Sequence, residues 1–164
     1  GGKSAQISSI AVDGGNISST SLSAPKAGEM WIGTANNNGG HDGEGHAFSS
    51  RPTRLDCMYK YRPYGSKQGQ VEVYLYDAEG NIIAQKAIHD IAEASSWTAY
   101  SVDFDYADTK VKAAKIYVIF RSANESGSGN YDVNINSPIE MAGSTMSAHV
   151  GSVLKIDDLQ LIYE

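Results

Sequence analysis

Residues 53–62 restrict the fold of this chain more than any other segment. In this segment two sets of side chains alternate along the chain. One set is Leu55, Cys57, Tyr59 and Tyr61, and the other is Arg54, Asp56, Met58 and Lys60. Successive side chains of a β-strand point to opposite faces of the sheet. The alternation therefore predicts a strand that packs one face on a core and presents the other face to solvent.

Further strand-length patterns recur along the chain, separated by Gly, Asn, Ser and Pro. We expect strands at residues 7–12, 29–33, 70–77, 82–88, 97–106 and 115–121, with residues 17–22 as a hairpin partner of the first strand. Residues 77–81 have the composition of a hairpin loop, and such short connections indicate antiparallel pairing. Residues 90–95 are the only stretch with a helical leaning.

Two of the expected strands carry more specific information. Residues 115–121 have apolar side chains on both faces, which predicts a central strand that is covered on both sides. The apolar residues of the last strand change phase at Asp157 and Asp158: they are Leu154 and Ile156 before this point, Leu159 and Leu161 after it. The strand would switch faces there unless a residue is inserted, so we predict a β-bulge at Asp157-Asp158.

These patterns predict one all-β domain. About eight strands, hardly any helix and no regular repeat are typical of a jelly-roll β-sandwich with antiparallel sheets and long loops at one rim. The 164 residues suit a single domain, 1–164, with an adequate core. Residues 1–25 form either an N-terminal hairpin of this domain or the remnant of a preceding one.

The charge balance excludes some partners. The formal charge is -6, and only 13 Lys and Arg are spread along the chain. Nucleic-acid binding needs clustered cations that neutralise phosphates, so we expect no nucleic-acid partner. An anionic membrane surface is disfavoured for the same reason.

Cysteine content and the chain start say little about location. Cys57 is the only cysteine, which excludes an intrachain disulfide, and its strand position predicts a buried small hydrophobe. No apolar run approaches the roughly 20 residues that span a membrane. Gly1-Gly2 resembles a cloning remnant, so we expect that targeting information was removed.

The loop at residues 36–46 holds four potential metal ligands, His41, Asp42, Glu44 and His46. Carboxylates would suit calcium, and paired imidazoles would suit zinc or nickel. Their spacing matches neither a zinc motif nor an EF-hand loop. We therefore favour a solvated loop over a metal site.

The aromatic content is lopsided, with 10 tyrosines against 3 phenylalanines. Aromatic faces pack on the C–H faces of sugar rings while phenol and indole edges form hydrogen bonds, so the bias fits carbohydrate recognition. Core packing is the alternative for each single residue. The expected stacking residues are Trp31, Tyr64, Tyr74 and Tyr131, beside the loops at 36–50 and 122–137.

Support for catalysis is thin. Asp103 and Asp105 lie on one strand face roughly 7 Å apart, a separation compatible with an inverting glycosidase. Almost any polar strand face offers such a pair, so a solvated face is the favoured interpretation. No serine lies in a G-x-S-x-G elbow.

Three segments of the chain resemble a known family. They are residues 28–33 (GEMWIG), 48–61 (FSSRPTRL leading to YKY) and 151–163 (GSVLKIDDLQLIY). They look like the carbohydrate metabolism domain family of surface and secreted proteins in polysaccharide-degrading gut bacteria. The resemblance implies a galactose-binding-like jelly roll on an exported lipoprotein, and it transfers no catalytic residue.

The resemblance also suggests a role for the rim. Arg51 and Arg54 are expected to donate hydrogen bonds to sugar hydroxyls or a uronate carboxylate, with His41 and His46 as further ligand contacts. For Arg51 the alternative is that its guanidinium satisfies loop carbonyls and fixes the turn.

Three functions remain, in order of preference. The first is a non-catalytic carbohydrate-binding module of a cell-surface or secreted polysaccharide-utilisation protein, whose partners are an oligo- or polysaccharide and the other domains of that protein. The second is a protein–protein adhesion or scaffold module, and the third is a glycoside hydrolase. A structural calcium ion at Asp157 and Asp158 is a separate hypothesis, because bulged carboxylates can share an ion.

Overall fold

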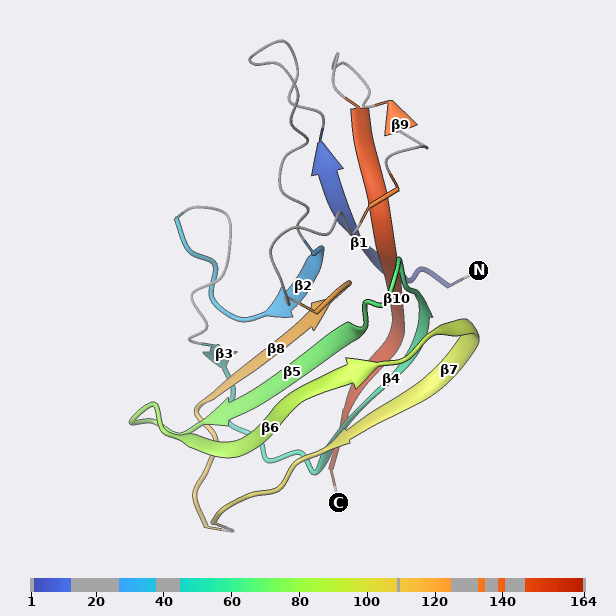
Figure 1. Ribbon diagram of the computed structural model, residues 1–164. Coiled ribbons are helices and arrows are strands. Elements are labelled where there is room, and N and C mark those ends of the chain that lie inside the picture. Colours follow the sequence, from blue (N-terminus) through green and yellow to red (C-terminus); the bar gives the residue numbers. More distant parts are fainter. Residues whose placement is uncertain are drawn as a thin grey trace.

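The computed structural model describes residues 2–12, 27–37, 45–108, 110–124, 133–134, 139–140 and 147–163, with only the backbone at 12, 85–88 and 139–140. Within these ranges every regular element is a β-strand, and the strands form two antiparallel sheets (Figure 1). The predicted all-β sandwich is confirmed. None of these residues belongs to an apolar helix long enough to cross a membrane.

Sheet A has the strand order β1-β10-β4-β7. Its strands are β1 (Ala5–Val12), β10 (Ser147–Ile162), β4 (Arg54–Arg62) and β7 (Ala94–Asp103), with the short β9 (Ile139–Glu140) paired to β10. Sheet B has the order β2-β8-β5-β6. Its strands are β2 (Glu29–Ile32), β8 (Lys115–Arg121), β5 (Gly69–Tyr76) and β6 (Ile82–Ile91), with β3 (His46–Ala47) paired to β8.

The described strands lie close to their predicted positions, and one local prediction is wrong. The helical leaning at residues 90–95 is overruled, because β6 continues to the fully buried Ile91 and β7 begins at Ala94. The predicted loop at 77–81 is confirmed: the Asp77 N–H donates to the Asn81 carbonyl at 2.9 Å. Residues 17–22 lie outside the described part of the chain, and the jelly-roll path stays a prediction.

The core lies between the inner faces of the two sheets. Its largest fully buried side chains are Tyr61, Phe120, Leu55, Leu75, Ile91, Leu154, Val71, Val73, Val102 and Val118. The predicted burial of β8 on both faces is confirmed, since Ile116 is 4 % exposed, Tyr117 5 % and Ile119 0 %. Cys57 is buried as well, as its strand position predicted.

The predicted β-bulge in β10 is also confirmed. The register of β10 on β4 shifts between Asp157 and Gln160. Asp158 adopts a positive φ of 50°, and its N–H donates to Asp157 Oδ1 at 2.9 Å. The inserted residue lets Leu161 pair with Leu55 on the core face, so both ends of this long strand contribute to the same core.

Ser122, directly after β8, joins the two sheets. Its Oγ accepts a hydrogen bond from the Gly28 N–H at 2.8 Å and shares another with Ser9 Oγ at 3.0 Å. Its carbonyl accepts from the Tyr61 hydroxyl at 2.9 Å. Gly28 can approach β1 this closely because it has no Cβ, which would lie 2.5 Å from the Ser8 carbonyl oxygen. The start of β2 is thereby held against both sheets.

The hydrogen bonds of Ser122 give a first prediction. We expect Ser122→Ala to lower the free energy of unfolding by about 1–3 kcal/mol, because the Gly28 N–H and the Ser9 hydroxyl lose their buried partner. Urea denaturation measures the change. Ser96→Ala, an exposed position on β7, is the control and should stay within about 0.5 kcal/mol; equal effects of the two substitutions would contradict this role of Ser122.

The backbone of Asp158 gives a second prediction. A β-branched residue is strained at positive φ, so Asp158→Val should cost about 1–2 kcal/mol. Asn tolerates this region, so Asp158→Asn should leave stability nearly unchanged. Thermal or urea unfolding of both variants checks this, and equal losses would show that the charge of Asp158, not its conformation, is what matters.

Candidate binding face on sheet B

The outer face of sheet B brings together aromatic and polar side chains from three strands. Trp31 pairs with Ile119, which also pairs with Glu72, and Tyr74 pairs with Tyr117. Paired residues of adjacent strands point to the same face of a sheet. We call this surface the tyrosine face; its members are Glu29, Trp31, Glu72, Tyr74, Tyr76, Tyr117, Ile119 and Arg121.

Three tyrosines form the centre of the tyrosine face. The rings of Tyr74 and Tyr76 have centroids 6.3 Å apart, those of Tyr74 and Tyr117 are 6.1 Å apart, and both pairs are inclined by 29°. By contrast, Tyr59 and Tyr100 of sheet A meet edge to face at 83°. Tyr74 and Tyr76 are only partly buried. Tyr117 is only 5 % exposed, so the accessible part of this nearly parallel aromatic row is at Tyr74 and Tyr76.

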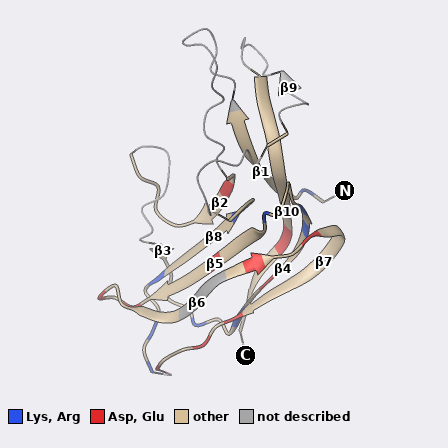
Figure 2. Cartoon of the chain, viewed as in Figure 1, with Lys and Arg blue, Asp and Glu red and all other residues tan. Residues whose placement is uncertain are grey.

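An ion-pair network fixes Tyr74 from one side. Arg121 Nε donates to Glu29 Oε1 at 3.0 Å, and Arg121 Nη1 donates to Glu72 Oε1. The Tyr74 hydroxyl donates to the other oxygen of Glu72, Oε2, at 3.0 Å. Although burial opposes its charge, hydrogen bonds to Glu72 and Glu29 raise the pKa of Arg121 above its ordinary value. Charged residues are otherwise spaced out along sheet B (Figure 2).

Burial keeps the phenols of the tyrosine face protonated. It raises the pKa of Tyr117 to about 12 and also raises the pKa of Tyr74 and of Tyr76. The hydrogen bond to Glu72 adds to the shift at Tyr74. At neutral pH these groups are neutral hydroxyls, suited to hydrogen bonds with a polar ligand rather than to proton transfer.

The structure places the sequence-predicted residues in different regions. Trp31 and Tyr74 belong to the tyrosine face. His46 is exposed and pairs with the core-facing Ile116, so it does not belong to that face. Tyr64 follows β4, where its N–H donates to Ser152 Oγ at 2.9 Å. His41 and Tyr131 lie outside the described residues.

Both predicted arginines are engaged within the protein. Arg51 donates to the carbonyls of Val111 at 2.6 Å and Asp108 at 2.8 Å, and its guanidinium carbon lies 3.7 Å from the centre of the Tyr106 ring. This is the loop-fixing role that the sequence left open as the alternative to sugar binding.

Arg54 forms two hydrogen bonds with a neighbour on its own strand. Its Nε and Nη2 donate to Asp56 at 2.6 and 2.9 Å, and these bonds hold the pKa of Asp56 below its ordinary value. Arg54 lies on sheet A, opposite Asp103 of β7. The structure therefore does not join either arginine to the aromatic row.

Among the described residues, the carboxylates considered for metal binding or catalysis do not form a cluster of metal ligands. The described residues contain no group of three or more His, Cys, Asp or Glu that could hold a metal ion. The calcium hypothesis at Asp157 and Asp158 stays a prediction. Asp103 and Asp105 are exposed at the end of β7, as expected of a solvated face.

The sequence placed Tyr76 on the same strand face as Tyr74 but did not single it out as a stacking residue, and it missed Glu29, Glu72, Tyr117, Ile119 and Arg121. Two signals were available. Tyr76 shares the strand phase of Tyr74, and Tyr117 lies on the second apolar face of residues 115–121. The pairing of β5 with β8 was needed to connect them.

Comparison of the chain with protein-family models, with curated proteins and with solved structures finds no match. The resemblance to the carbohydrate metabolism domain family thus stays a prediction from the quoted segments.

The buried phenol of Tyr117 gives a third prediction. Its pKa in the fold is about 12, above the ordinary 10.0, so its contribution to stability is complete below pH 10 and is lost as the pH rises through 12. Tyr117→Phe removes this titration. We expect the unfolding free energy of the variant to fall less steeply with pH in that window, measured by urea denaturation; an unchanged slope would contradict the assigned burial.

Proposed function

We propose that this protein is a non-catalytic carbohydrate-binding module that binds a neutral oligo- or polysaccharide on the tyrosine face of sheet B. The observation that carries the proposal is the nearly parallel row of Tyr74, Tyr76 and Tyr117 on the outer side of the sandwich. Tyr74 and Tyr76 are the partly exposed members of this row, and exposed aromatic rings present the flat surface on which sugar C–H faces pack.

Polar groups at one edge of the row supply hydrogen bonds. Glu72 is held by both Tyr74 and Arg121, and the Glu72 and Arg121 side chains are 12 % and 15 % exposed. A sugar hydroxyl both donates and accepts, so it can bond to a carboxylate oxygen and to a phenol in the same position. Because these groups already hold one another in place, little side-chain entropy would be lost when a sugar binds.

The charge of the tyrosine face favours a neutral ligand. This face of sheet B carries three carboxylates and two cations. The carboxylates are Glu29, Glu72 and Asp90, and the cations are Arg121 and Lys115. Without a cationic excess, the face offers no attraction to an acidic glycan.

The family resemblance extends the proposal to the whole protein. It supports a galactose-binding-like jelly roll that belongs to a polysaccharide-utilisation protein, exported as a lipoprotein and displayed or secreted at the cell surface. In that setting the neighbouring domains of the same protein would be its other partners.

A glycan array of neutral plant and host oligosaccharides, followed by calorimetry with the ligands found, tests the function. Tyr74→Ala and Tyr76→Ala should each weaken binding at least about tenfold, which corresponds to about 1.4 kcal/mol. Tyr163→Ala is the matched control, because Tyr163 is 53 % exposed at the end of β10 and outside the tyrosine face. It should bind as the unchanged protein does.

Two results would contradict the proposal. One is the absence of binding to any neutral glycan on the array. The other is binding that Tyr74→Ala and Tyr76→Ala leave intact, which would place the ligand elsewhere. Release of reducing ends from a bound glycan would instead indicate a hydrolase.

A further inference from the structure

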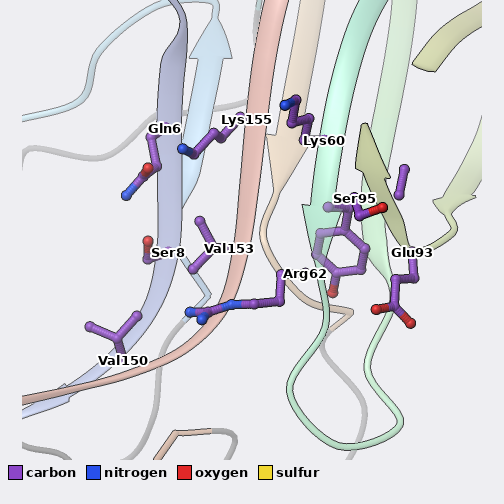
Figure 3. A pocket seen from close by; sticks show the side chains of 11 residues that line it. Gln6, Ser8, Lys60, Arg62, Glu93, Ser95, Val150, Val153 and Lys155 are labelled. Atoms are coloured by element: carbon purple, nitrogen blue, oxygen red, sulfur yellow. The ribbon is translucent and has the colours of Figure 1, made fainter. Parts of the chain in front are cut away.

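The opposite side of the sandwich carries a recessed surface. A hollow of about 730 Å³ lies on sheet A, lined by residues of β1, β4, β10 and the start of β7, and by Glu93 of the turn before β7. Figure 3 shows Lys60 and Lys155 near one end of the hollow and Arg62 extending from β4 towards Val153 and Val150. We call it the cationic hollow.

The charge of the cationic hollow is opposite to that of the chain. Lys60, Arg62 and Lys155 line it together with a single carboxylate, Glu93. The hollow therefore carries +2 in a protein of net charge -6, which leaves -8 for the remainder. Three of the 13 Lys and Arg of the chain thus line one hollow.

The strand register places two of these cations directly against each other. Lys155 of β10 pairs with Lys60 of β4, and Val153 pairs with Arg62. Like charges directly opposite on adjacent strands repel each other. Across the described residues, no carboxylate lies within ion-pair distance of these three cations. An anion bound between them would relieve that repulsion.

Uncharged groups beside the cations fit a sugar. Gln6 pairs with Lys155 and Ser8 pairs with Val153, so an amide and a hydroxyl line the β1 side of the hollow. Trp97 is 39 % exposed, and its ring centre lies 5.2 Å from Lys60 Nζ. An exposed indole next to ammonium groups can stack on a pyranose ring whose acidic substituent meets the cations.

We propose that the cationic hollow binds an acidic saccharide residue, with Lys60, Arg62 and Lys155 contacting its carboxylate or sulfate group and Trp97 contacting its ring. This second site lies on the other sheet and does not depend on the tyrosine face. Nucleic acid and an anionic bilayer fit less well than a short acidic saccharide, because three cations neutralise few phosphates and the negative remainder of the chain would repel a large anionic surface.

Calorimetry with four ligands tests the site: an oligomer of galacturonic acid, its neutral methyl ester, a sulfated galactan oligomer and vesicles that contain phosphatidylserine. We expect at least one of the two acidic oligomers to bind, with an affinity that falls as salt is added. If the galacturonate oligomer binds, it should bind at least about tenfold more tightly than its methyl ester. The vesicles should not bind. Binding of neither acidic oligomer, equal binding of acid and ester, or comparable binding of the vesicles would overturn the proposal.

Substitutions locate the site. Arg62→Gln and Lys155→Gln should each weaken acidic-oligomer binding about tenfold while the melting temperature is unchanged or higher, because a repelling charge is removed. Lys112→Gln removes one charge from an exposed position outside the hollow and should bind normally. Tyr74→Ala should also leave acidic-oligomer binding intact, which separates this site from the tyrosine face. Normal binding by Arg62→Gln and Lys155→Gln would overturn the assignment.

Discussion

Burial of β8 on both of its faces is the constraint on which the rest of the sandwich depends. Ile116, Val118 and Phe120 complete the core against sheet A, while Tyr117 and Ile119 are buried on the outer side. Each such side chain contributes about 1.5–3 kcal/mol when it leaves water. Along β8 the outer face of sheet B is therefore covered by other parts of the chain, and the partly exposed aromatic residues, Tyr74 and Tyr76, lie on the neighbouring β5.

The outer faces of the two sheets differ in how their charges are paired. On sheet B, Arg121 forms ion pairs with Glu29 and Glu72, so these charges of the aromatic surface are paired. On sheet A, Lys60 and Lys155 are paired with each other in register, and no carboxylate of the described residues forms an ion pair with either. The two proposed sites thus differ in the ligands they would take, neutral sugar rings on sheet B and acidic groups on sheet A.

Local periodicity predicted the parts of the fold that depend on neighbouring residues. The alternation in β4, the two apolar faces of β8 and the phase change at Asp157-Asp158 are properties of a few consecutive residues, and the structure confirms all three. The helical leaning at 90–95 failed for a tertiary reason. Burial of Ile91 and the pairing of Ala94 with Tyr61 outweigh a weak local preference.

The candidate site depends on contacts that no local pattern contains. Tyr74 meets Tyr117, and Glu72 meets Arg121, only because β5 pairs with β8 across more than a quarter of the chain. Arg51 looked available for a ligand because its carbonyl partners, at Val111 and Asp108, lie in a distant connection. Sequence reasoning therefore emphasised a rim loop, whereas the pairing of the strands assembles an open sheet face.

Mapping of amide chemical shifts by NMR during titration with a neutral oligosaccharide tests the central claim most directly. We predict that the largest changes occur in β5 and β8, at Tyr74, Tyr76 and Tyr117, with little change in β4 and β10. Largest changes around His46 and Arg51 or on sheet A, or no change with any neutral oligosaccharide, would contradict it.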